Sequence, residues 1–133
     1  MEKIDYIASI GSGHEGSLFK AIKLVGEAAG AGATGIKFQL FRAASLDSRP
    51  EMRRKLHFYE LPLAWLPDLR AQTQRCNLTL GVTPFAVDLV EELHGMVDWI
   101  KISAYDLTFD DLLEAAATLG VPVVLGTAMA TTR

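Results

Sequence analysis

The sequence predicts an α/β fold of the (β/α)8, or TIM-barrel, type, with about the first five strands and four helices present. Short apolar segments rich in β-branched residues alternate with segments of helical periodicity, which is typical of a parallel sheet covered by helices. The strand segments also alternate between an aliphatic face and a face that becomes polar towards the carboxyl end, as in the wall of a barrel. We therefore expect residues 1–133 to form the N-terminal part of one barrel domain.

The composition limits the possible settings and partners. Half of the 133 residues are hydrophobic and 22% are charged, which suits a globular domain with a sizeable core. A formal net charge of −3 gives no reason to expect binding to nucleic acid or to an acidic membrane surface. Cys76 is the only cysteine, which excludes an internal disulfide. With no secretory signal and no apolar segment of about 20 residues, we expect a cytoplasmic protein.

The predicted strands and helices follow one another along the chain. The strands are short apolar segments at residues 4–10, 34–40, 78–85, 97–103 and 121–127. The first helix covers residues 17–32, begins at Ser17 as its N-cap and ends at glycines. Further helical segments are predicted at residues 51–56, 64–76, 86–95 and 108–120. Because strands alternate with helices, the strands should pair in parallel.

A glycine motif after the first strand suggests an alternative fold. The segment "GSGHEG" at residues 11–16 matches the G-x-G-x-x-G pattern of dinucleotide-binding α/β domains, and it lies between a strand and a helix. That pattern also requires an acidic residue at the end of the second strand, where this sequence has Gln39, Leu40 and Phe41. Any tight turn from strand to helix favours glycine, so we keep the dinucleotide-binding domain as the less favoured alternative.

Two lysines in strand segments suggest a binding site. In the second strand Lys37 shares a face with Gln39, opposite to the aliphatic face, and Lys101 lies in the same way in the fourth strand. Thr83 and Ser103 lie at the carboxyl ends of the third and fourth strands, at the mouth where barrel enzymes have their active sites. These five polar side chains should therefore converge on one pocket.

An enclosed ammonium group is costly unless a negative charge compensates it. Two converging lysines with nearby hydroxyls would suit a ligand with several negative charges, such as a phosphate or a phosphorylated carboxylate. The alternative is that each lysine pairs with a carboxylate of the protein. The inner face of the strands offers few partners for such a pair, mainly Asp5 and Asp106.

Five segments of the chain resemble motifs of one enzyme family. In order, "IASIGSGHEGS", "GIKFQLF", "GVTPF", "WIKISAYDLT" and "PVVLGTAMAT" are similar to "AEIG-x-NH-x-GS", "VKFQ", "STPF", "KIAS-x-E" and "LSTGMAT" of the sialic acid (N-acetylneuraminate) synthase family. The resemblance covers nearly all of the chain. It implies a TIM barrel that condenses phosphoenolpyruvate with an N-acetylated amino sugar, usually N-acetylmannosamine, to a nonulosonic acid and releases phosphate. It also implies a divalent metal, Mn²⁺ or Mg²⁺, and a homodimer.

The resemblance also implies roles for individual residues. Lys37, Thr83 and Lys101 match positions that hold the phosphate and carboxylate of phosphoenolpyruvate. The full set of expected substrate-binding residues is Lys37, Gln39, Thr83, Lys101, Ser103 and Thr127. The expected catalytic residues are His14, which matches the histidine of the NH-x-G turn, and Asp106. The metal ligands of the family come from later strands, so we expect none in this chain.

Several positions depart from the family motifs. Ser9 replaces the glutamate of "AEIG", Gly13 the asparagine before the histidine, Ala104 the serine of "KIAS", and Gly126 the serine of "LSTGMAT", while Asp106 is a shortened glutamate. These departures leave most of the expected phosphate contacts in place but alter the sugar side. Spore-coat and capsule polysaccharide relatives vary in a similar way. A non-catalytic barrel that binds phosphate or a sugar phosphate is therefore a second alternative.

A complete (β/α)8 barrel usually takes about 250 residues. Five predicted strands amount to the N-terminal half of such a barrel, so we expect the chain to be a fragment of a longer protein. We expect the isolated 133 residues to be catalytically inactive.

Overall fold

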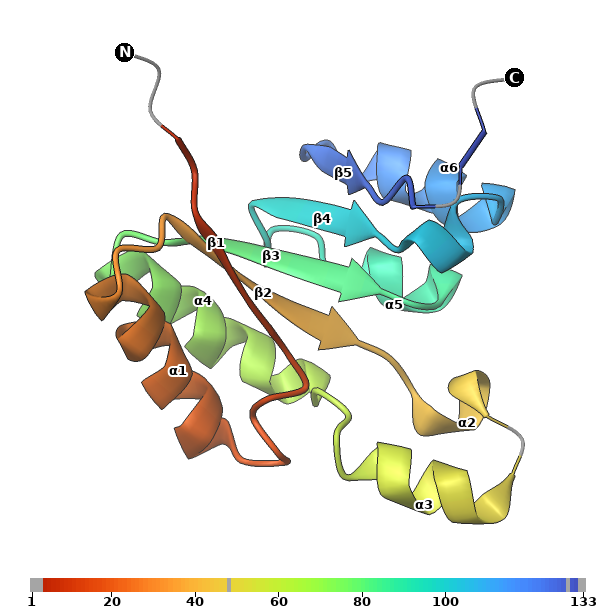
Figure 1. The fold of residues 1–133 in the computed structure, drawn as a ribbon, viewed down its shortest axis with the longest axis horizontal. Helices are drawn as coiled ribbons and strands as arrows, with labels where there is room; N and C mark the ends of the chain where they lie inside the picture. Colours follow the sequence, from red (N-terminus) through yellow and green to blue (C-terminus); the bar gives the residue numbers. More distant parts are fainter. Residues whose placement is uncertain (1–3, 48, 129, 132–133) are drawn as a thin grey trace.

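The computed structural model describes residues 4–47, 49–128 and 130–131. Its centre is one parallel five-stranded sheet whose strands lie side by side in chain order (Figure 1). The strands are β1 (Ile7–Gly11), β2 (Gly35–Leu40), β3 (Thr79–Pro84), β4 (Trp99–Ile102) and β5 (Val123–Leu125). All five predicted strands are confirmed. A doubly wound sheet reverses its strand order at a switch point, so the unbroken order fits a barrel wall and not the dinucleotide-binding alternative.

Helices connect the successive strands. They are α1 (Leu18–Gly30), α2 (Ala43–Leu46), α3 (Pro50–His57), α4 (Leu66–Arg75), α5 (Val87–Glu91) and α6 (Asp110–Thr118). Helices α1 and α4 lie together along the β1–β3 part of the sheet, while α5 and α6 contact each other near β4 and β5 (Figure 1). Among the described residues, no helix is both long and apolar enough to cross a membrane.

The first helix begins as its sequence predicts. The Ser17 hydroxyl accepts a hydrogen bond from the Lys20 N–H at 3.2 Å, which satisfies one of the free donors of the first turn. Ala21, Val25 and Ala28 are buried along the face that meets the sheet and α4. The predicted N-cap is therefore confirmed.

One helix was not predicted from the sequence, and another is shorter than predicted. Helix α2 was not predicted, since its four residues are too few to show a helical period. The helix predicted at residues 86–95 is α-helical only over Val87–Glu91. Beyond it the Leu93 N–H reaches the carbonyl of Val90 at 3.0 Å, and Gly95 has a φ of +70°, which a regular helix cannot contain. The shortened helix still places Leu93 fully in the core.

The aliphatic face of the sheet forms the core. Ile36, Phe38, Leu80, Val82 and Ile100 are all fully buried against the helices. Burying one such side chain contributes about 2 kcal/mol, so this face supplies much of the stability of the fold. The alternation of faces predicted from the sequence is confirmed.

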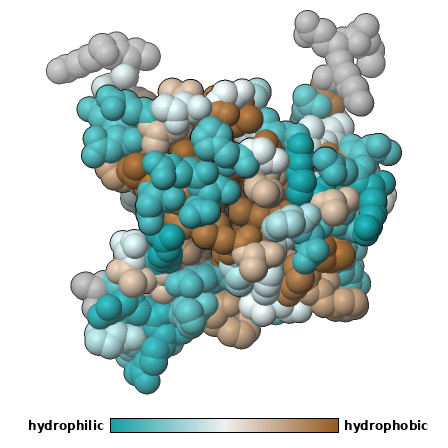
Figure 2. All heavy atoms as spheres, turned by 180° about the vertical axis from the view of Figure 1, so that it is seen from behind, coloured by the Kyte–Doolittle hydropathy of each residue, from teal (hydrophilic) through white to brown (hydrophobic). Residues whose placement is uncertain are grey.

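The edges of the sheet carry exposed apolar groups. On β1 the side chain of Ile7 is 44% exposed, and on β5 Val124 and Leu125 are both 47% exposed. On the face shown in Figure 2, apolar side chains gather near the middle and are surrounded by polar ones. Among the described residues, neither edge strand has a partner on its outer side.

A carboxylate ties together three elements near the amino ends of the strands. Asp98 Oδ2 accepts hydrogen bonds from the Leu80 N–H at 2.8 Å and from the Arg70 guanidinium at 2.5 Å. The Asp98 N–H in turn donates to the Leu80 carbonyl at 2.8 Å. Burial acts to raise the pKa of Asp98, but the hydrogen bonds from Arg70 and Leu80 outweigh it, so this pKa lies below its usual value.

We predict that Asp98→Asn destabilises the fold in a pH-dependent way. Since folding lowers the pKa of Asp98, its ionised form stabilises the fold above the unfolded-state pKa of about 4, and this contribution is lost as the pH falls below it. The variant should lose about 1–2 kcal/mol at pH 7, as expected for charged hydrogen bonds.

Urea unfolding of wild type and Asp98→Asn at neutral and at acidic pH measures this effect. The difference should shrink on acidification. Asp88→Asn is a control, because Asp88 is paired with Arg42 on the exposed surface, where an ion pair adds little. A difference that does not change with pH would contradict the role of the Asp98 charge.

Candidate functional site

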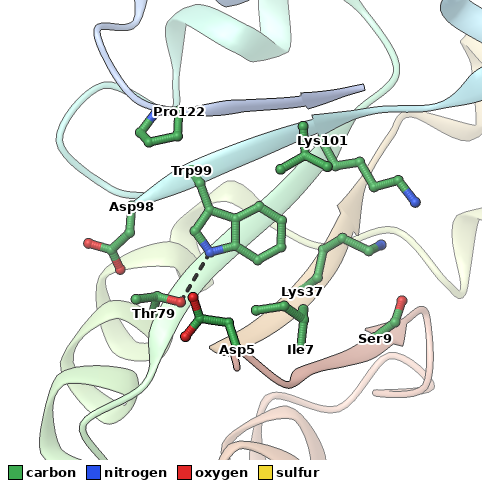
Figure 3. Close-up of a pocket in the computed structure, with 10 residues that line it drawn as sticks. Asp5, Ile7, Ser9, Lys37, Thr79, Asp98, Trp99, Lys101 and Pro122 are labelled. Atoms are coloured by element: carbon green, nitrogen blue, oxygen red, sulfur yellow. Dashed lines mark hydrogen bonds between the residues drawn. The ribbon is translucent and has the colours of Figure 1, made fainter. Parts of the chain in front are cut away.

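A cavity of about 640 Å³ lies on the face of the sheet opposite to the core (Figure 3). Side chains from β1, β2, β3 and β4 reach into it, because every second residue of a strand points to this face. Its walls are partly apolar, from Ile7, Trp99 and Val124. It is therefore a partly dry hollow in which charged groups interact more strongly than in water.

Two lysines lie side by side in this cavity. Lys37 extends from β2 and Lys101 from β4, and their ammonium groups point in the same direction (Figure 3). Lys37 is only 8% exposed. Burial, followed by the charge of Lys101, lowers the pKa of the Lys37 ammonium below its usual value. The two neighbouring positive charges repel each other, and a bound anion would reduce this repulsion.

The alternative in which each lysine pairs with a carboxylate does not hold within the described residues. Neither Lys37 nor Lys101 forms an ion pair or hydrogen bond there. Asp5 lies in the same cavity but at its opposite end (Figure 3). Asp98, also at that end, is already bound to Arg70 and Leu80. The basic end of the cavity is therefore open to an anion.

The indole of Trp99 forms the floor between the two ends. Gly81 lies in register between Lys37 on β2 and Trp99 on β4. A Cβ atom on Gly81 would overlap the six-membered ring of Trp99, so the ring lies directly over this glycine. The indole N–H donates to Thr79 Oγ1 at 3.1 Å, which fixes its direction (Figure 3). Sequence reasoning assigned Trp99 no role, because its position over Gly81 depends on the register of β3 and β4.

Thr83 and Gln39 are paired in register near the carboxyl ends of their strands, but neither is among the residues that line the cavity. Of the five side chains predicted to converge, the lining contains Lys37 and Lys101. Thr83 is 3% exposed, and among the described residues its buried hydroxyl has no hydrogen-bond partner. An unsatisfied buried hydroxyl costs about 1–3 kcal/mol, so it suits a position that a ligand satisfies. Gln39 Oε1 accepts a hydrogen bond from Ser12 at 3.3 Å, which ties it to the turn after β1.

The predicted residues after β4 and β5 lie outside the cavity lining. Ser103 caps the short 3₁₀ helix Ala104–Asp106, and its hydroxyl accepts the Tyr105 N–H at 3.3 Å. Asp106 is half-buried, one of its oxygens has no partner among the described residues, and burial raises the pKa of its carboxyl. Thr127 is exposed. Their assigned roles stay predictions.

His14 lies in the turn before α1 and not in the cavity lining. The ring is fully buried, its Nδ1 accepts the Gly16 N–H at 3.1 Å, and it meets the ring of Trp65 edge-on at 5.5 Å. Burial, followed by the charge of Lys20, lowers the pKa of His14, which favours the neutral ring. In this geometry His14 holds the turn together, and its catalytic role remains a prediction.

Two of the departures from the family motifs have a clear structural setting. Ser9 pairs in register with Lys37 and lines the cavity, so the missing carboxylate would have faced this lysine. A Cβ atom on Gly126 would lie 2.7 Å from the backbone nitrogen of Ala104, so a serine cannot fit there without a backbone shift.

The described residues do not provide a metal site. Over residues 4–47, 49–128 and 130–131, no group of three or more His, Cys, Asp or Glu side chains could hold a metal ion. The divalent metal implied by the resemblance, with ligands expected from later strands, stays a prediction, and no chemical step is assigned to it.

Comparison with known proteins identifies relatives of this chain. N,N'-diacetyllegionaminic acid synthase of Campylobacter jejuni is 32% identical, over 98% of this chain and 44% of its own length. Spore coat polysaccharide biosynthesis protein SpsE of Bacillus subtilis is 28% identical, over 92% of this chain and 36% of its own length. The chain thus spans less than half the length of these relatives.

A solved structure of a related synthetase also matches this chain. The crystal structure of N-acetylneuraminic acid (sialic acid) synthetase from Leptospira borgpetersenii matches 98% of this chain with a TM-score of 0.91 and 30% identity, and this chain covers 47% of it. The predicted α/β fold of TIM-barrel type is confirmed by this match. The model of the NeuB family matches residues 24–133. Since that match covers most of the sequence and agrees with the relatives and the fold, the chain belongs to the NeuB family.

Proposed function

We propose that this chain carries the phosphoenolpyruvate-binding part of a sugar-acid synthase. The enzyme would join phosphoenolpyruvate to the open-chain aldehyde of an N-acetylated amino sugar and release phosphate. The observation that carries the proposal is the pair of lysines, Lys37 and Lys101, in one cavity without a described carboxylate partner. The Campylobacter and Leptospira relatives are synthases of sugar acids, which supports the same reaction class here.

Phosphoenolpyruvate has the charges that this site lacks. It carries a phosphate and a carboxylate on the same carbon atom, C2, so it can satisfy two ammonium groups at once. The hydroxyl of Thr83 is a further donor without a partner in the described part of the chain. The Leptospira relative was crystallised in complex with citrate, another small compound with several negative charges. This agrees with an anion site but does not identify the ligand of this chain.

The lysines have a direct part in the proposed reaction. The C=C electron pair of phosphoenolpyruvate forms a bond from C3 to the aldehyde carbon as the aldehyde C=O π bond breaks; the aldehyde oxygen takes up a proton, and positive charge is left at C2. Water adds to C2 and loses a proton, and the C–O bond to phosphate then breaks as the remaining hydroxyl loses its proton and becomes the C2 ketone. Lys37 and Lys101 hold the phosphate throughout and stabilise its charge as it leaves. Asp106 is the carboxyl that the family resemblance proposes as catalytic; burial raises its pKa, and it lies outside the cavity lining.

The sugar side of the site is expected to differ from that of the family motif. With Ser9 in place of glutamate, the position facing Lys37 offers a hydroxyl and no charge. Because a carboxylate would orient a sugar differently, we infer that the preferred sugar is not fixed by family membership. Assembly as a homodimer and location in the cytoplasm are part of the same proposal.

A non-catalytic anion-binding barrel is the second candidate. It is favoured by Gly126, which stands where the motif has a serine and whose close contact with Ala104 leaves no room for one. One phosphate-binding hydroxyl is thus missing. Such a protein would bind phosphate or a sugar phosphate but would not consume phosphoenolpyruvate.

We predict that Lys37→Met and Lys101→Met, made in the complete protein that contains these residues, each lower phosphate release by about 100-fold or more. Each change removes a charge that stabilises the leaving phosphate while keeping most of the apolar stem. Phosphate release under saturating substrates and calorimetric titration with phosphoenolpyruvate measure the effect.

Lys23→Met is the matched control, since Lys23 lies exposed on α1 and pairs only with Glu27. It should leave both measurements unchanged. Wild-type turnover in either Lys37→Met or Lys101→Met would remove the proposed roles of the lysines.

A second prediction separates the enzyme from the binding protein. In the complete protein, wild type should consume phosphoenolpyruvate with at least one of several N-acetylated amino sugars, and Ser9→Glu should change which sugar is preferred. The reason is that the new carboxylate would face Lys37 across the β1–β2 pair. Ser9→Gln, of equal size but uncharged, should not reproduce the change. If neither wild type nor Ser9→Glu consumes phosphoenolpyruvate with any sugar, the binding protein is the better account.

A further inference from the structure

The amine of Lys37 has surroundings that differ from those of an ordinary anion-binding lysine. Its side chain is nearly buried, yet it borders a cavity of about 640 Å³ that a small molecule can enter. Within the described part of the chain it has no hydrogen bond and no ion pair. A buried lysine that has no negatively charged partner gains little from remaining an ammonium ion.

The groups around Lys37 also favour the uncharged amine. From β4, Lys101 brings a second cation to the same end of the cavity, and from β1 Ser9 brings only a hydroxyl. The two carboxylates of the cavity, Asp5 and Asp98, lie at the other end, beyond the indole of Trp99 (Figure 3). Burial and the charge of Lys101 accordingly lower the pKa of Lys37.

Trp99 adds apolar surface to the cavity beside the lysine end. Its ring lies over Gly81, the residue that separates Lys37 from Trp99 in the same row of the sheet. Ile7 and Val124 add further apolar surface. A desolvated lysine next to another cation is the arrangement that activates an amine as a nucleophile towards carbonyl compounds.

We propose that Lys37 Nζ is a covalent site that forms an imine with a small oxo acid, whose carboxylate or phosphate is held by Lys101. The proposed condensation uses Lys37 only as a charge, so this site goes beyond that function. A ligand of this class needs an aldehyde or ketone carbon next to, or within a few bonds of, an anionic group.

The reaction balances without any oxidant or reductant. The Nζ lone pair attacks the carbonyl carbon as the C–O π bond breaks, and the oxygen gains a proton to give a carbinolamine. Loss of water then forms the C=N bond. The protonated imine and Lys101 are both positive, and the anionic group of the ligand offsets this charge.

The same geometry makes the two uses of Lys37 compete. A bound phosphate or phosphoenolpyruvate favours the ammonium form, because an opposite charge nearby stabilises it. The ammonium form has no lone pair to attack a carbonyl. Anion binding should therefore protect Lys37 from imine formation.

Reductive trapping with glyoxylate and cyanoborohydride tests the proposal on the full chain at neutral pH. Reduction of the imine leaves a carboxymethyl group on the lysine, which peptide mass spectrometry assigns to a residue. The internal controls are Lys20, Lys23 and Lys55, which are all more exposed than Lys37. The expected result is several-fold faster modification of Lys37, persisting to lower pH than that of the three controls. Modification of Lys37 that is no faster than that of the exposed lysines would overturn the proposal.

Two further comparisons address the folded site and the anionic group. In urea, where the fold is lost, the preference for Lys37 should disappear; a preference that survives would assign it to the local sequence and overturn the proposal. Acetaldehyde, which has no anionic group, should modify Lys37 with less preference than glyoxylate does, and Lys101→Met should remove the difference. Equal preference for both compounds in wild type would overturn the role of Lys101.

Addition of phosphoenolpyruvate separates this proposal from the proposed function. If phosphoenolpyruvate slows the trapping of Lys37 but not that of the control lysines, both the covalent site and the proposed function are supported. Trapping at Lys37 without protection supports the covalent site and counts against phosphoenolpyruvate at Lys37. Absence of selective trapping overturns the covalent site, while the calorimetric titration described above still decides the binding of phosphoenolpyruvate.

Discussion

Two positive charges share one cavity on the inner face of this sheet, and their repulsion is the main constraint on the arrangement of that face. Lys37 and Lys101 come from strands separated by β3, and they reach the same end of the cavity because parallel strands in register carry corresponding residues to the same face. No described carboxylate neutralises them. Such an arrangement persists only if the rest of the fold is stable enough to hold it, and the dry aliphatic face with its helices supplies that stability.

Much of this arrangement could be predicted from the sequence, because successive side chains of a β-strand point to opposite faces of the sheet. Once Ile36 and Phe38 were placed against the helices, Lys37 had to point to the other face, and the structure agrees. The Ser17 N-cap was equally predictable, since capping depends on a local hydrogen bond. Helix α2 was not predicted, because a single turn leaves no periodic pattern in the sequence.

What the sequence did not reveal depends on contacts between strands. The role of Trp99 follows from its overlap with Gly81, which is visible only when β3 and β4 lie side by side in a known register. The buried state of His14 depends on Trp65, some fifty residues away along the chain. The sequence motif alone suggested that His14 is catalytic, whereas the structure shows that its ring also supports the turn before α1. In both residues, long-range packing determines what the side chain can do.

The Asp98 contacts lie at the amino ends of the strands, and the two lysines point towards the carboxyl ends (Figure 3). The Trp99 ring lies between them. Groups that hold the fold together and groups that meet a ligand are therefore different residues in different places. A collection of variants confined to the carboxyl ends could explore new ligands while the Asp98 contacts remain intact. For protein engineering, this separation assigns ligand selectivity and stability to different residues of the sheet, which can be varied one set at a time.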